Sequence, residues 1–67
     1  MARRKYNLVG IDGNAFSVMG YVRNAMRAEG FTRQEIEDYT KDATSSDYNH
    51  LIAVSCDMVD ECNSRRK

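Results

Sequence analysis

Residues 26–36 read MRAEGFTRQEI and hold both the end of one helix and the start of the next. Gly30 can take the left-handed backbone conformation that ends a helix, and Phe31 after it would pack back on the preceding turn. Thr32 and Glu35 form the T-x-x-E pattern of a capping box, with Phe31 placed as its hydrophobic staple. The stretch therefore predicts two helices that meet at Phe31.

Upstream of this corner, apolar residues recur with the period of a helix, and we expect that helix over about residues 14–29. The apolar arc is wide enough to contact an N-terminal strand and two other helices, or one of these and a second subunit. The apolar positions are Ala15, Phe16, Val18, Met19, Tyr21, Val22, Ala25, Met26 and Ala28.

Downstream, the pattern predicts helices over about residues 32–43 and 47–63. The run LIAVSC at residues 51–56 could pass for a strand by itself, but the longer helical period favours a helix. Ser46 or Asp47 is expected to cap this last helix. Its apolar stripe contains Tyr48, Leu51, Ile52, Ser55, Met58, Val59 and Cys62.

The N-terminal stretch KYNLVGI alternates in the manner of a β-strand, which we expect over about residues 5–11. The predicted fold class is thus mainly α with a minor β part, a short strand followed by a three-helix unit. Residues 1–67 are expected to form a single small domain, in which residues 1–4 and 64–67 are flexible basic tails.

The turn Asp12-Gly13-Asn14 lies where a strand-to-helix connection often holds a phosphate. Its G-x-x-G spacing matches neither the Walker A motif nor the dinucleotide fingerprint, and Asp12 puts a negative charge where the phosphate would sit. A calcium loop would need a glycine and a glutamate that are missing. We interpret Gly13 as supplying a backbone angle that other residues dislike, and Asp12 or Asn14 as the helix cap.

The chain offers few residues for catalysis or metal binding. His50, Cys56 and Cys62 are too few soft ligands and match no zinc pattern. On one helix the two cysteines would be roughly 9 Å apart along the axis, which excludes a disulfide between them. A lone histidine without a nearby nucleophile is more often a surface residue than a catalyst. We predict no catalytic residue, no metal and no cofactor, hence a non-enzymatic protein.

The few cysteines and the lack of an apolar signal or membrane segment predict a cytoplasmic location and no membrane partner. The net charge is zero but uneven: +4 over residues 1–34, −7 over residues 35–64 and +3 over residues 65–67. A neutral total argues against a dedicated nucleic-acid binder. The uneven distribution could steer the pairing of two chains, or attract the two halves of one molecule.

Gly20 lies in the middle of the first predicted helix, where glycine costs roughly 1 kcal/mol relative to alanine. Close approach of another backbone, either this chain's own strand or a second subunit, would explain it; a ligand-facing gap is the functional alternative. Gly20, Arg23 and Arg27 are therefore the candidate interaction face. A chain of 67 residues buries only a modest share of its surface, so its core alone gives little stability. We therefore expect a partner chain to supplement the core.

Two segments, YNLVGIDGNAFSVMGYVRNAMRAEG and ATSSDYNHLIAVSCDMVD, resemble a group of small proteins from gut bacteria and their phages or mobile elements. The shared pattern is LVG-x-DGNAF followed by ATS-x-DY-x-HL, and the likeness covers residue 6 to about residue 60. The resemblance implies a phage or mobile-element origin and no particular activity.

Together these patterns predict a small interaction module that acts by protein–protein contact. It would be a homodimer, or would bind a protein partner through the N-terminal strand or the first helix. The alternative is a nucleic-acid-associated accessory protein that uses Arg23, Arg27, Arg33 and the basic termini.

Overall fold

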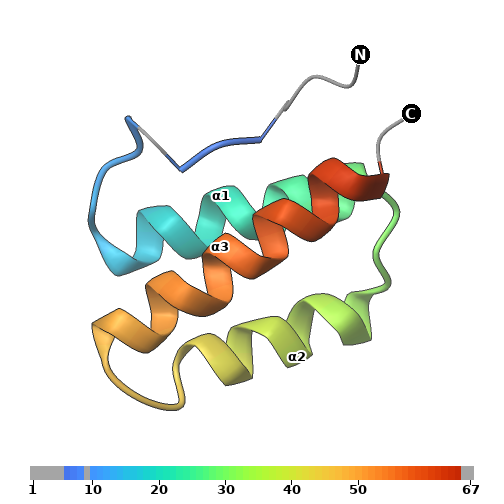
Figure 1. Cartoon of the computed structure of the whole chain (residues 1–67). Coiled ribbons are helices and arrows are strands. Elements are labelled where there is room, and N and C mark those ends of the chain that lie inside the picture. Colours follow the sequence, from blue (N-terminus) through green and yellow to red (C-terminus); the bar gives the residue numbers. More distant parts are fainter. Residues whose placement is uncertain (1–5, 9, 66–67) are drawn as a thin grey trace.

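The computed structural model describes residues 6–8 and 10–65 of the chain. It contains three helices, α1 (Ala15–Ala28), α2 (Arg33–Ala43) and α3 (Tyr48–Arg65), and every pair of helices is in contact. Figure 1 shows that α2 runs opposite to α1 and α3, so the start of α1, the end of α2 and the start of α3 lie at one end of the bundle. The mainly helical class and the order of three helices are as predicted.

The strand expected over about residues 5–11 remains a prediction, because residues 5 and 9 lie outside the described residues. No strand is present in the described residues 6–8, 10 and 11. At Tyr6 the backbone bonds to α3 instead. Its N–H donates to Asn63 Oδ1 at 3.0 Å, and Asn63 Nδ2 donates to the Tyr6 carbonyl at 3.0 Å.

The corner between α1 and α2 follows from local sequence. Gly30 has φ +86°, and the Phe31 N–H donates to the carbonyl of Met26 at 3.0 Å, which closes the end of α1. Thr32 Oγ1 accepts the Glu35 N–H at 3.1 Å, and Glu35 Oε1 accepts the Thr32 N–H at 2.8 Å. Both halves of the capping box are therefore formed, and α2 begins where the pattern placed it.

The helix α3 continues to Arg65, two residues further than expected, so residues 64 and 65 are helical rather than part of a tail. The Arg65 guanidinium carbon lies 3.8 Å from the centre of the Phe31 ring. This cation–π contact stabilises the last turn of α3 against the α1–α2 corner. Arg65 also pairs with Glu61 one turn earlier, at 3.7 Å.

The start of α1 corrects the expectation for the glycine turn. Asn14 is the N-cap, because its Oδ1 accepts the Phe16 N–H at 2.8 Å, while Asp12 Oδ1 accepts the N–H of Asn14 at 3.2 Å. The left-handed backbone belongs to Gly10 with φ +85°, and not to Gly13. The turn needed one glycine with positive φ, and the sequence did not show which of the two provides it.

The core lies between the three helices, with Tyr6 packed against it from the N-terminal segment. Ser55 is fully buried within it, and its hydroxyl lies 2.6 Å from the Tyr39 hydroxyl, so each supplies the other's partner. The buried apolar side chains are Tyr6, Val18, Met19, Val22, Ala25, Met26, Ile36, Tyr39, Ala43, Leu51, Val59 and Cys62.

Candidate interaction surface

A pocket of about 340 Å³ opens at the end of the bundle where α1 starts, α2 ends and α3 starts. Its lining is mainly apolar, and Asp47 is the one charged residue among the lining residues. These are Ala15, Phe16, Met19, Ala43, Thr44, Ser46, Asp47, Tyr48 and Leu51.

Two aromatic side chains beside this pocket are exposed to water. Phe16 in the first turn of α1 is 81% exposed, and Tyr48 in the first turn of α3 is 48% exposed. The sequence pattern placed both among the apolar positions of their helices, but neither ring is buried in the core. We call Phe16, Tyr48 and the pocket that they line the Phe16 surface. An exposed phenylalanine beside an apolar pocket is typical of a binding surface.

Tyr48 is fixed in place by a contact with the turn before α1. Its hydroxyl donates to the carbonyl oxygen of Gly13 at 2.5 Å. A Cβ at Gly13 would lie 3.5 Å from that hydroxyl, an ordinary contact distance. The bond joins two segments that are 35 residues apart in the sequence and holds one wall of the pocket.

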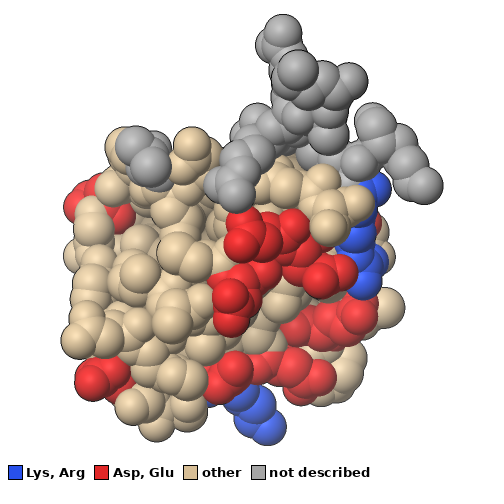
Figure 2. Space-filling view, in the orientation of Figure 1, with Lys and Arg blue, Asp and Glu red and all other residues tan. Residues whose placement is uncertain are grey.

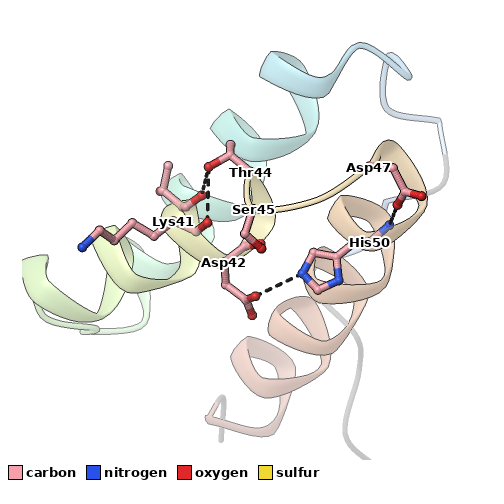
Figure 3. A network of polar contacts seen from close by, with 7 residues as sticks. Lys41, Asp42, Thr44, Ser45, Asp47 and His50 are labelled. Carbon is pink, nitrogen blue, oxygen red and sulfur yellow. Dashed lines mark hydrogen bonds and ion pairs between the residues drawn. The ribbon is translucent and has the colours of Figure 1, made fainter.

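The link between α2 and α3 also lines the pocket, through Thr44, Ser46 and Asp47. Figure 3 shows the polar contacts of this link. Asp47 Oδ1 accepts the His50 N–H at 2.9 Å and so caps α3, while His50 Nε2 lies 3.0 Å from Asp42 Oδ1 near the end of α2. Thr44 Oγ1 donates to the Thr40 carbonyl at 2.8 Å and closes the last turn of α2. The acid and the histidine nearest the pocket are therefore both engaged in holding helix ends.

The outer side of α1 carries the predicted interaction face. Phe16, Gly20, Arg23 and Arg27 are all exposed, and their spacing of four, three and four residues puts them on one side of the helix. Apart from its two chain neighbours and the nearby backbone of α1 itself, no described atom lies within 4 Å of the position that a Cβ would take at Gly20. Packing of this chain's own N-terminal strand on Gly20 is therefore not found among the described residues.

The arginines of the predicted nucleic-acid alternative lie on two helices. Arg23 and Arg27 are on α1, where Arg27 Nη1 donates to Asn24 Oδ1 at 2.9 Å. Arg33 is on α2 and pairs with Glu37 at 3.0 Å. Most residues of the basic termini lie outside the described residues. Figure 2 shows acidic side chains gathered over α2 and α3, whereas the bundle end at the start of α1 and α3 is mostly uncharged.

Neither cysteine points to a metal or redox site. Both are free, with Cys56 exposed and Cys62 buried, and burial raises the pKa of the Cys62 thiol. No group of three or more potential metal ligands comes together within residues 6–8 and 10–65. Over the same residues, no helix has the length and apolar character that crossing a membrane requires.

Two segments that lie far apart in the sequence meet at the Phe16 surface. Ala15, Phe16 and Met19 contribute from the start of α1, and residues 43–51 contribute the end of α2 and the start of α3. The surface was not foreseen from the sequence, because residues 16 and 48 become neighbours only through the packing of the helices. Comparison of the chain with family models, curated proteins and solved structures gives no match.

Proposed function

We propose that this protein is a small non-enzymatic interaction module of phage or mobile-element origin that acts in the cytoplasm by contact with another protein through the Phe16 surface. The observation that carries the proposal is the 81% exposure of Phe16 at the mouth of an apolar pocket. Burying a phenylalanine side chain is worth about 1.5–3 kcal/mol. Aromatic anchors of this kind dominate the binding energy of protein interfaces.

The polar groups around the surface support binding rather than catalysis. Asp47 caps α3 through the His50 N–H, and His50 contacts Asp42. A general acid or base needs a free, directed group near the reacting atoms. Here the acid and the histidine nearest the pocket hold the helix ends that shape it.

The contacts of the N-terminal segment favour the first helix over the strand as the binding element. Strand pairing with a partner would use backbone N–H and C=O groups of residues 5–11. Tyr6 already pairs both backbone groups with Asn63, and the Asn7 N–H donates to the Tyr21 hydroxyl at 2.9 Å. The start of α1, by contrast, presents an exposed ring.

Site-specific photo-crosslinking in the native host tests this function. A benzoyl-phenylalanine replaces Phe16 in one variant and the exposed Asp57 of α3 in a control variant. We expect discrete protein adducts from position 16 and none of these from position 57. Equal adduct patterns from the two positions, or no protein adduct from position 16, would contradict the proposal.

The second candidate function is association with nucleic acid through α1. It is favoured by Arg23 and Arg27, which lie on one exposed face and form no ion pair within the described residues. Binding to a random duplex at about 50 mM salt, lost as salt rises and weakened in Arg23→Ala/Arg27→Ala, would support this function. No duplex binding at that salt concentration removes it.

A further inference from the structure

We infer that the partner of the Phe16 surface is a second copy of this chain, with the two α1 helices antiparallel and each Phe16 ring in the pocket of the other copy. The inference rests on the proposed function, because it names the partner of the same surface. The position of the ring, the open face at Gly20 and the order of charges along α1 support it.

The Phe16 ring and the pocket that would receive the ring of a second copy lie side by side on one chain. Phe16 lines the pocket but remains 81% exposed, so its own chain does not bury it. The pocket volume of about 340 Å³ leaves room for an aromatic ring. In a two-fold dimer the same patch faces itself, so one rotation places both rings in both pockets. Such an interface closes on itself and covers both rings.

Gly20 lies one helical turn after Phe16 on the same exposed side of α1. With no described atom within 4 Å of its Cβ position, the backbone is open to a neighbour. With the two Phe16 rings exchanged, Gly20 of one copy lies about 6 Å past them along the axis, at the level of the turn before α1 of the other copy. That turn can approach closely at a residue without a side chain. This accounts for a mid-helix glycine that nothing in the described part of the chain itself requires.

The charged residues along this side of the molecule are opposite in sign to those that an antiparallel second copy would place beside them. Asp12 and Asp47 lie beside the helix starts, and Arg23 and Arg27 lie toward the other end of α1. Arg23 follows Phe16 by seven residues, about 10.5 Å along the axis. With the rings exchanged, Arg23 of one copy extends past the start of α1 in the other, where the acids lie. Each carboxylate can accept this bond besides its present one, because it has four acceptor sites.

Sedimentation equilibrium of the full chain tests the ring exchange. We expect the mass to rise with concentration from the 7.7 kDa of one chain toward twice that value. Phe16→Ala is expected to weaken this association by about tenfold or more, because it removes a central aromatic anchor. Asp57→Ala, an exposed change on α3, is the matched control and should leave association unchanged. Circular dichroism melts show that each variant is folded.

A charge exchange between copies tests the antiparallel order. A dimer of Arg23→Glu would place residue 23 of each copy, now acidic, beside Asp12 of the other, and a dimer of Asp12→Lys would place two basic residues together in the same way. Each variant alone is therefore expected to sediment as a monomer. An equal mixture of the two restores both contacts in a heterodimer and is expected to regain the dimer mass.

A wild-type chain that stays monomeric up to millimolar concentration overturns the inference, as does a dimer that Phe16→Ala leaves intact or a mixture that stays monomeric. If the chain is monomeric and position 16 crosslinks to a foreign protein, self-pairing is wrong and the proposed function stands. If position 16 crosslinks to no protein, not even to its own copy, both fail.

Discussion

At the scale of single residues, the pair Tyr39 and Ser55 is the main polar contact inside the core. The two hydroxyls are 2.6 Å apart and join α2 to α3. A buried polar group that loses its partner costs about 1–3 kcal/mol, whereas removal of both partners costs less than the sum. We therefore expect Ser55→Ala and Tyr39→Phe each to lower the free energy of unfolding, and the double variant to lose less than the two single losses added. Urea denaturation of all four chains measures this; strict additivity would contradict a bonded pair.

The same tyrosine predicts a pH dependence of stability. Burial raises the pKa of Tyr39 above its ordinary value of 10.0, although the bond to Ser55 and the charge of Arg23 act in the opposite direction. Because the pKa is higher in the folded state, the contribution of this group is complete below about pH 10 and is lost as pH rises through the folded pKa. The wild type should therefore lose stability above pH 10 more steeply than Tyr39→Phe. Parallel pH profiles would contradict this.

Gly20 and Gly30 form a matched pair, since a Cβ would meet no described atom at either position. Gly20 lies inside α1, so Gly20→Ala should stabilise the monomer by about 1 kcal/mol. Gly30 has φ +86°, so Gly30→Ala should destabilise it by about 1–2 kcal/mol. Chemical denaturation at low protein concentration gives both signs. A loss of stability in Gly20→Ala would mean that this helix face is packed within the chain.

At the scale of elements, the helices were predictable from signals within a few neighbouring residues. The contacts between the helices and the segments that join them depend on residues far apart in the sequence. The α1–α2 corner was predictable because Gly30, Thr32 and Glu35 act within a few residues of one another. The contact of Tyr48 with Gly13 was not predictable, because the two residues are 35 apart in the sequence. The helical spacing of apolar residues gives no information about such a contact. The two additional residues at the end of α3 depend in the same way on a contact that is distant in sequence, that of Arg65 with Phe31.

The N-terminal segment is attached to α3 through Asn63. Asn63 both donates to and accepts from the backbone of Tyr6, as a strand partner would. Asn63→Ala removes both bonds, and we expect a loss of about 1–3 kcal/mol with faster amide exchange at Tyr6. Asn63→Asp keeps the acceptor and loses the donor, so it should preserve protection of the Tyr6 amide better than Asn63→Ala does. Equal exchange in all three chains would show that Asn63 does not hold the segment.

At the scale of the whole molecule, the two ends of the bundle differ in character. Acidic side chains gather over α2 and α3, whereas the Phe16 surface lies at the mostly uncharged end (Figure 2). A chain of 67 residues has a small core, so surface left apolar at one end is unusual unless a partner covers it. We therefore propose that the protein acts through the Phe16 surface.

The most direct test of pairing between two copies through the Phe16 surface is a dilution series of ¹H–¹⁵N spectra on the isotope-labelled chain. Association through the Phe16 surface predicts concentration-dependent shifts at Ala15, Phe16, Gly20 and Tyr48, with no change at Asp57. Spectra that do not depend on concentration, or shifts confined to the acidic side of α2 and α3, would contradict pairing of two copies through the Phe16 surface.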